Sequence, residues 1–270
     1  MTLLTVENLD LKFDTDEGRI TAVDNVSFEL NSGEVLGLVG ESGSGKSVTA
    51  KSLMHLNPSN AVYGAGSEIY LELERDVVDV LSLKSSRELK IVRGGAISMI
   101  FQEPMASFAP AITIGAQMVE QLLIHSSLSK KEAAELSVEM LDRVGISEAR
   151  HRFYQYAFEL SGGMRQRAMI AMALSTKPKV LIADEPTTAL DVTIQAQVLD
   201  LMKELVAEFG MAILFITHDL SVIAQTADRV AVMYLGRILE TGTVRQVIQT
   251  PAHPYTQGLL NSLPKLDALD

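Results

Sequence analysis

The sequence predicts an α/β protein whose core is a mostly parallel β-sheet. Three observations support this class: short apolar runs recur along the chain, helical patterns separate several of them, and an alternating pair of segments precedes the first run. The pair covers residues 2 to 13 and 22 to 30, which we expect to form antiparallel strands of an N-terminal β-subdomain. The runs expected in the parallel sheet are residues 34 to 39, 96 to 101, 180 to 183, 212 to 217 and 229 to 233.

A helical subdomain is expected to interrupt the sheet domain at about residues 103 to 177. No convincing strand pattern occurs between Thr113 and Leu174, and residues 130 to 144 show helical periodicity. We expect residues 1 to 250 to form one domain that carries this insertion. Residues 251 to 270 are expected to be a C-terminal extension with a short helix.

Composition excludes several classes of chemistry. The 270 residues include no cysteine, so a disulfide, a thiolate nucleophile and a cysteine-ligated metal are all excluded. The formal charge of -11 opposes binding to nucleic acid. The N-terminal residues lack the pattern of a secretory signal, and no apolar run approaches the roughly 20 residues that cross a bilayer. The mean hydropathy of +0.19 fits either an apolar partner surface or core helices rich in Ala and Met.

The segment GESGSGKS, from Gly40 to Ser47, fits the pattern G-x-x-x-x-G-K-[ST] between an expected strand and an expected helix. Its glycines let backbone N–H groups turn toward phosphate oxygens, the Lys46 ammonium adds positive charge, and the Ser47 hydroxyl suits Mg²⁺. The residues expected to contact the nucleotide here are Gly40, Ser42, Gly43, Ser44, Gly45, Lys46, Ser47 and Val48. The loop alone does not distinguish hydrolysis from phosphoryl transfer to a substrate.

Two acidic residues, Asp184 and Glu185, follow the apolar run 180 to 183. The carboxyl ends of parallel strands share one edge of a sheet, where the phosphate loop is also expected. Asp184 is suited to holding Mg²⁺, usually through water, and Glu185 to polarising an attacking water, which favours hydrolysis. The alternative is that the two carboxylates are solvated or cap the next turn.

Gln102 and His218 each follow an expected strand as well. Gln102 is placed to reach Mg²⁺ or water, and a surface residue is the alternative. The His218 imidazole can bond a γ-phosphate or orient Glu185, and a structural histidine is the alternative. The residues alone leave both choices open.

The segment Leu160-Ser161-Gly162-Gly163-Met164, followed by Arg-Gln-Arg and a helical pattern, resembles the signature motif of ABC ATPases. The order of phosphate loop, Gln102, signature, Asp184-Glu185, a turn at 188 to 191 and His218 is similar to that family over nearly the whole chain. The resemblance implies a P-loop (RecA-like) core, an ABC-type nucleotide-binding domain over residues 1 to 250, and ATP and Mg²⁺ as ligands. It implies Glu185, His218 and Gln102 as catalytic residues, Ser47, Gln102 and Asp184 at the metal, and Ser161, Gly162, Gly163 and Asp191 at the nucleotide.

The signature is expected to be a second anion-binding helix start, with backbone N–H groups and the Ser161 hydroxyl. In ABC ATPases two domains pair head to tail, so that one signature covers the γ-phosphate bound by the other loop. The resemblance therefore implies a second ABC ATPase subunit, either a different chain or an identical one. It also implies two membrane permease subunits, a periplasmic or extracellular solute-binding protein acting through the complex, and a position on the cytoplasmic face of the cell membrane.

Met164, where the family motif usually has Gln, and the tail Pro251-Ala-His-Pro-Tyr-Thr256 resemble the peptide and nickel importer branch. This implies ATP-driven import, with an oligo- or dipeptide as the leading solute and an oligosaccharide or nickel chelate as alternatives. Two features depart from the branch. The chain has no cysteine for the iron–sulfur cluster that many members carry, and residues 107 to 110 read SFAP where SLNP is usual in the region facing the permeases.

The family stacks an aromatic ring on adenine near the end of the first strand, and Phe13 is the matching residue. A core position in an alternating strand is the alternative for Phe13. Two other functions are also weighed: a soluble ABC ATPase of DNA repair, chromosome structure or translation, and an exporter ATPase. The first usually has coiled-coil insertions, cysteine zinc sites or tandem domains, and the second is opposed by Met164 and the tail.

Overall fold

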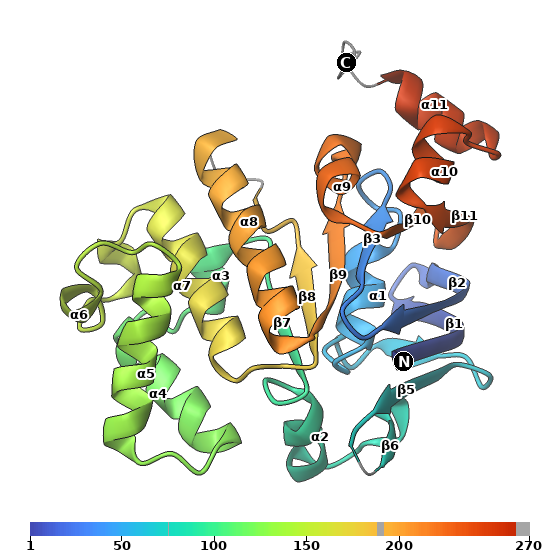
Figure 1. Cartoon of the computed structure of the whole chain (residues 1–270). Helices are drawn as coiled ribbons and strands as arrows, with labels where there is room; N and C mark the ends of the chain where they lie inside the picture. Colours follow the sequence, from blue (N-terminus) through green and yellow to red (C-terminus); the bar gives the residue numbers. More distant parts are fainter. Residues whose placement is uncertain (75, 188–191, 263–270) are drawn as a thin grey trace. The chain divides into compact units, whose positions relative to one another are not determined.

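The computed structural model describes residues 1–74, 76–187 and 192–262. The chain divides into two compact units (Figure 1). Unit 1 combines Met1–Leu81 with Leu214–Asp270, and unit 2 is Ser82–Ile213. Among the described residues, the helices are all too short or too polar to cross a membrane.

Unit 1 begins with an antiparallel sheet, and the two expected N-terminal strands are confirmed. β1 (Thr2–Thr15) pairs with β2 (Gly18–Asn31) in antiparallel register from Thr2 opposite Asn31 to Thr15 opposite Gly18. The strand order is β2-β1-β5-β6, and β4 pairs with the far end of β1. The further strands are β4 (Ala61–Tyr63), β5 (Glu68–Glu72) and β6 (Val77–Asp79).

A β-bulge resets the alternation of β1 so that one face stays apolar. Leu4 and Val6 are buried, but the next buried residues are Leu9 and Leu11, three and five positions after Val6. The register shifts between Val6 and Leu9, where Asn8 adopts a left-handed φ of 48°. The extra residue in the bulge therefore returns Leu9 to the core face.

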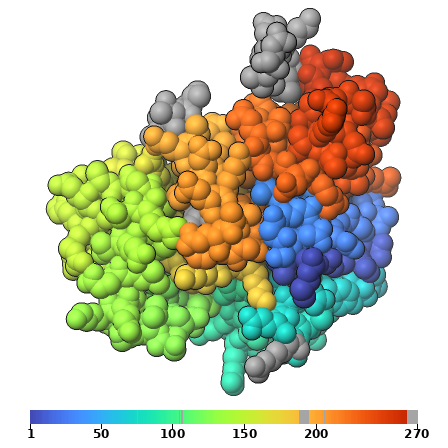
Figure 2. All heavy atoms as spheres, in the orientation of Figure 1, coloured from blue at the N-terminus to red at the C-terminus, as the bar shows by residue number. Residues whose placement is uncertain are grey.

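The second sheet of unit 1 carries the phosphate loop. Its strand order is β11-β10-β3-β9, with β10 parallel to β3 and antiparallel to β11. The division between the units falls within β9. The elements are β3 (Val35–Val39), α1 (Lys46–Ser52), β9 (Ala212–Thr217), α9 (Leu220–Thr226), β10 (Arg229–Tyr234), β11 (Arg237–Thr243), α10 (Val244–Gln249) and α11 (Pro254–Ser262). Figure 2 shows the red and orange C-terminal elements of this unit beside its blue N-terminal residues.

Unit 2 contains two parallel strands and a group of helices. β7 (Ile97–Ile100) pairs with β8 (Val180–Asp184) from Ile97 opposite Val180 to Ile100 opposite Ala183, as parallel neighbours. The 3-10 helix η1 (Val80–Ser82) crosses the boundary between the units. The helices are α2 (Ser86–Val92), α3 (Pro104–Ser107), α4 (Ile114–His125), α5 (Lys130–Arg143), α6 (Ala149–Arg152), η2 (Ala157–Glu159), α7 (Gly162–Ser175) and α8 (Val192–Phe209).

The ends of α5 show why the sequence forms a helix there. Ser129 and Glu132 make a reciprocal capping box at its start, in which each side chain bonds the other residue's backbone N–H. Gly145 follows the last turn with φ 76°, and the Ile146 N–H donates to the Leu141 carbonyl at 3.0 Å. A residue in this conformation ends a helix, so α5 ends at Arg143, one residue before the predicted end.

Gly115, in the first turn of α4, is closely packed against a neighbouring side chain. A Cβ there would lie 2.4 Å from three carbon atoms of the Phe153 ring. Gly258, in α11, has nothing within 4 Å of the same point. The same substitution therefore meets a packed ring at one site and open space at the other.

We expect Gly115→Ala to lower the free energy of unfolding by about 1–3 kcal/mol, because Phe153 and the backbone must shift to accept a methyl group. Gly258→Ala should instead raise it by about 0.5–1 kcal/mol, since alanine is the better helix former. Urea unfolding followed by circular dichroism measures both. A Gly115→Ala protein as stable as wild type would contradict the packing described for α4.

Candidate functional site

The phosphate loop joins β3 to α1, and its backbone admits only glycine at two positions. Gly40 and Gly45 have φ of 157° and 103°. A Cβ on Gly40 would lie 2.1 Å from the Met233 carbonyl oxygen, and one on Gly45 would lie 2.6 Å from the Ala22 carbonyl oxygen. The glycines in the motif are therefore required by close backbone approach as well as by the turn itself.

The loop surrounds the ammonium group of Lys46, which is the buried end of a side chain only 7% exposed. Its Nζ donates to the carbonyl oxygens of Gly40 at 2.7 Å and Glu41 at 2.8 Å, and to the Ser44 hydroxyl at 3.3 Å. These neutral acceptors hold the charge inside the loop. A phosphate oxygen would be a stronger acceptor because it is itself charged.

The other predicted loop residues lie where a nucleotide phosphate can reach them. Ser42 and Gly43 are exposed at the tip, and Ser44 is buried beneath them. Ser47 and Val48 are half-buried in the first turn of α1. A glycine cradle, a buried ammonium and a hydroxyl at the helix start fit a nucleotide triphosphate with its Mg²⁺.

Phe13 and His218 also lie in unit 1. Phe13 is half-buried near the end of β1, opposite Ile20 on β2 and Ala61 on β4, outside the row of fully buried residues that ends at Leu11. His218 is exposed and directly follows β9. The stacking role of Phe13 and the phosphate contact of His218 remain predictions.

In unit 2 the structure brings together two of the predicted catalytic residues. Asp184 is the buried last residue of β8, and Glu185 follows it with a left-handed φ of 48°. The Gln102 amide, just after β7, donates to a Glu185 carboxylate oxygen at 3.4 Å. Gln102 is thus placed to influence where the Glu185 carboxylate points.

Ser161 is the N-cap of α7, as the signature motif predicts for a helix start. Its hydroxyl accepts the Met164 N–H at 3.3 Å. Gly162 is exposed, with nothing within 4 Å of its Cβ position, and Gly163 is half-buried. The first turn of α7 therefore leaves room for a ligand or another chain at Gly162.

Gln166 is a residue whose role the sequence analysis missed. It lies in the second turn of α7, is 2% exposed, and donates its amide hydrogen to the Pro186 carbonyl. This bond ties the signature helix to the segment that directly follows Glu185. A glutamine among the buried apolar residues of a helix was the only signal for it in the sequence.

The remaining expectations concern the turn at 188 to 191 and the residues that would hold a metal ion. Asp191 and the turn at 188 to 191 lie outside the described residues. Within the described residues, no group of three or more His, Asp or Glu side chains is arranged to hold a metal ion. The predicted set of Ser47, Gln102 and Asp184 is of another kind, with a hydroxyl, an amide and one carboxylate.

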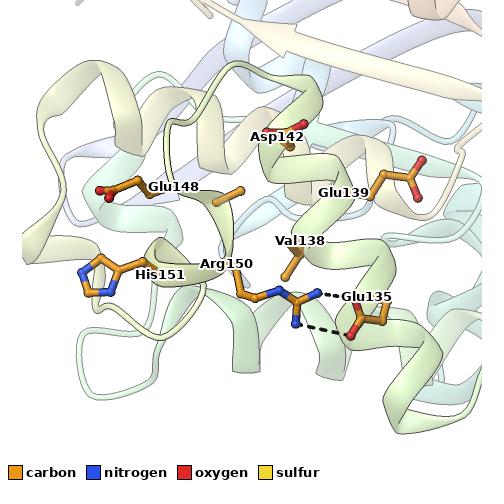
Figure 3. Close-up of a pocket in the computed structure, with 8 residues that line it drawn as sticks. Glu135, Val138, Glu139, Asp142, Glu148, Arg150 and His151 are labelled. Carbon is orange, nitrogen blue, oxygen red and sulfur yellow. Dashed lines mark hydrogen bonds and ion pairs between the residues drawn. The ribbon is translucent and has the colours of Figure 1, made fainter.

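Two cavities of unit 2 are separate from the predicted residues. One of about 600 Å³ lies at α5 and α6, where Arg150 forms an ion pair with Glu135 (Figure 3). Another of about 610 Å³ lies at α4 and has an apolar lining that includes Leu123, Ile124 and Phe153. None of the residues predicted for the nucleotide lines either cavity.

The family model described as "ABC transporter" matches residues 23–188 of the chain. The chain belongs to the ABC transporter family. A second model, "Oligopeptide/dipeptide transporter, C-terminal region", matches residues 239–270 of this family member. The α/β class with a P-loop (RecA-like) core, expected from the motifs, is confirmed.

Curated relatives of this ABC protein include proteins named as import ATP-binding proteins. "Glutathione import ATP-binding protein GsiA" of Shigella flexneri is 51% identical over 268 residues, which are 99% of this chain and 43% of that protein. A "putative peptide import ATP-binding protein" of Brucella abortus (strain 2308) is 53% identical over 265 residues, 98% of this chain and 78% of that protein. The chain thus spans less than half the length of the glutathione relatives.

Solved structures agree with the family. The dimeric post-hydrolysis state of the ATP-binding cassette MJ0796 bound to ADP and Pi has a TM-score of 0.78 at 26% identity, covering 90% of this chain and 99% of that one. A Clostridium perfringens protein, cbiO1, described as part of an ABC transporter complex, has a TM-score of 0.73 at 26% identity, with 92% and 91% covered.

We expect Gln166→Met to lower the free energy of unfolding by about 1–3 kcal/mol, because the buried Pro186 carbonyl loses its donor. Gln197→Met is the matched control, since Gln197 is exposed and accepts a hydrogen bond from Arg167, and it should change stability by less than about 0.5 kcal/mol. Denaturant unfolding of the two variants and of the wild type measures these free energies of unfolding. Equal stabilities would show that the Gln166 bond contributes nothing.

Proposed function

We propose that this chain is the ATP-binding and ATP-hydrolysing subunit of an ABC importer, powering solute uptake through separate permease subunits. The observation that carries the proposal is the loop at 40–47, in which a buried ammonium is surrounded by a backbone that admits only glycine at two points. Such a loop suits a ligand with several negatively charged oxygens.

The binding step follows from the loop. Backbone N–H groups of the loop would bond phosphate oxygens of the nucleotide, and the Lys46 ammonium would gain a charged acceptor. The Ser47 hydroxyl, Gln102 and Asp184 are the side chains that would hold Mg²⁺. When bound, Mg²⁺ neutralises charge that develops on the phosphate oxygens. Phe13 supports the adenine ring by stacking.

In the hydrolysis step, Glu185 is the general base that activates the attacking water. Its carboxylate accepts a proton from a water whose oxygen attacks the γ-phosphorus, the bond to the β-phosphate oxygen breaks, and ADP leaves with phosphate as the other product. The Gln102 amide orients the Glu185 carboxylate through their hydrogen bond of 3.4 Å. His218 bonds the γ-phosphate, and Asp191 completes the set proposed at the nucleotide.

A peptide is the solute that we propose. The C-terminal match at 239–270 is described as an oligopeptide and dipeptide transporter region. The relatives carry names that refer to import of peptides and of glutathione, which is itself a tripeptide. The solute would be chosen by the permeases and a solute-binding protein, since the residues discussed here all serve a nucleotide.

A second ABC ATPase subunit, different or identical, completes each nucleotide site in this proposal. One anion-binding segment is the start of α7 in unit 2, which contains Ser161, Gly162 and Gly163. The other is the phosphate loop at the start of α1 in unit 1. The similar cassette MJ0796 was solved as a dimer. We propose that the pair lies on the cytoplasmic face of the cell membrane, bound to two permease subunits, with no part in nucleic-acid binding.

Glu185→Gln is expected to keep ATP affinity within about twofold and to reduce phosphate release by about 10²–10⁴-fold, because only the proton acceptor for water is lost. Lys46→Ala should weaken ATP binding by about 10- to 100-fold, because a charge-assisted bond to phosphate is removed. Calorimetry gives the affinities, and a phosphate-release assay on the assembled complex gives turnover.

Lys51→Ala, in the same helix as Lys46, and Glu139→Gln, exposed on α5, are the matched controls and should behave as wild type. Wild-type turnover by Glu185→Gln in the complex would refute its assignment to water. Unchanged affinity in Lys46→Ala would refute the assignment of the loop to phosphate.

A further inference from the structure

The C-terminal helix α11 is fastened to β11 by one carboxylate. The Glu240 side chain accepts the N–H groups of Ala252 at 2.8 Å and His253 at 3.0 Å. Partial burial opposes ionisation of Glu240, but these bonds and the nearby Thr256 hydroxyl outweigh it and lower its pKa. The bonds fix the two residues that precede α11, and so they fix where the helix starts.

The start of α11 brings Tyr255 onto Tyr234, the last residue of β10. The two ring centroids are 4.3 Å apart, with the ring planes tilted by 34°. The Tyr255 hydroxyl oxygen is buried, and among the residues that the structure describes it has no hydrogen-bond partner of normal geometry. It lies close to Glu41, and burial together with the Glu41 carboxylate raises the pKa of Tyr255 despite the opposing effect of the Glu41 backbone.

Tyr234 leads directly into a hairpin tip that contacts the phosphate loop. Leu235 and Gly236 have φ of 45° and 81°, which is the pattern of a tight type I′ turn between β10 and β11. The Gly236 N–H donates to the Ser44 carbonyl at 2.9 Å, and the Gly236 carbonyl accepts the Asp24 N–H at 2.8 Å. The tip is therefore bonded to both the loop and β2.

Met233, just before Tyr234, touches the loop as well. Its carbonyl oxygen lies against Gly40, and its terminal methyl group would be 2.8 Å from a Cβ on Gly45. The residues on either side of Tyr234 thus contact both ends of the phosphate loop. The Tyr255 ring packs on Tyr234, so it also restrains these contacts with the phosphate loop.

We propose that Tyr255 is a positioning residue for ATP binding, whose ring packs on Tyr234 and holds the β10–β11 tip and the phosphate loop in the conformation that receives phosphate. The C-terminal segment thereby has a part in the nucleotide site without touching the nucleotide. This inference rests on the proposed function, because it concerns the affinity of the loop for ATP. The ring carries the effect, because it is the ring of Tyr255 that packs on Tyr234.

The experiment measures Mg·ATP affinity of the full chain by calorimetry. Tyr255→Ala should weaken binding by about 3- to 10-fold, the size expected when one aromatic pair no longer restrains the loop. Tyr255→Phe keeps the ring and should bind within about twofold of wild type. Tyr154→Ala, an exposed tyrosine of unit 2, is the control for loss of a tyrosine and should bind as wild type.

A double variant separates positioning from general destabilisation. In a Lys46→Ala background, Tyr255→Ala should add less than about twofold, because the loop contact that it supports is already lost. Equal ATP affinity in Tyr255→Ala and wild type, or full additivity in the double variant, would overturn the inference. So would a Tyr255→Phe protein as weak as Tyr255→Ala.

If Tyr255→Ala does not fold, Tyr255→Leu replaces it, and the same weakening is expected from loss of the ring. Wild-type affinity in Tyr255→Leu would then overturn the inference. Failure of the wild-type chain itself to bind Mg·ATP would instead contradict the proposed function. The two failures are thus distinguished by the wild-type measurement alone.

Discussion

The close approach of the phosphate loop to neighbouring main chain is the constraint on which unit 1 depends. The Met233 carbonyl faces Gly40, the Ala22 carbonyl faces Gly45, and the Gly236 N–H bonds the Ser44 carbonyl. These contacts come from backbone atoms of β2, of β10 and of the turn after β10, and they restrain the loop together with the bonds from its own Lys46 side chain. Lys46 is buried within this loop, where its ammonium group bonds the carbonyl oxygens of Gly40 and Glu41.

Unit 2 has a comparable constraint at Glu185. Its left-handed φ of 48° is unfavourable for a residue with a side chain, by about 1–2 kcal/mol, and such conformations persist where surrounding structure fixes them. Here the buried end of β8 precedes it, and the bond from Gln166 holds Pro186 after it. This turn presents the Glu185 carboxylate to Gln102. The strained backbone at Glu185 thus accompanies the role that we propose for its carboxylate.

Local patterns in the sequence were enough for much of the fold. The alternating strands β1 and β2, the loop after β3 and the cap at Ser161 each depend on residues close in sequence, so motif and periodicity predicted them. Four of the strands that the structure describes were missed. β4 and β6 have only three residues each, and β5 and β11 contain charged residues among their apolar ones. Gln166 and Tyr255 act through contacts 20 or more residues away, to Pro186 and Tyr234, and no local pattern encodes these.

We propose that the chain has two anion-binding segments that serve different ATP molecules: its own phosphate loop, and a helix start at Ser161 that completes the site of a partner. Hydrogen exchange on the Glu185→Gln chain, with and without Mg·ATP, distinguishes the two segments. In the chain alone, we expect ATP to protect amides 40–48 and to leave 161–166 unprotected. Adding the second ATPase subunit should extend protection to 161–166. Protection of both segments by ATP in a chain that remains monomeric would contradict the account.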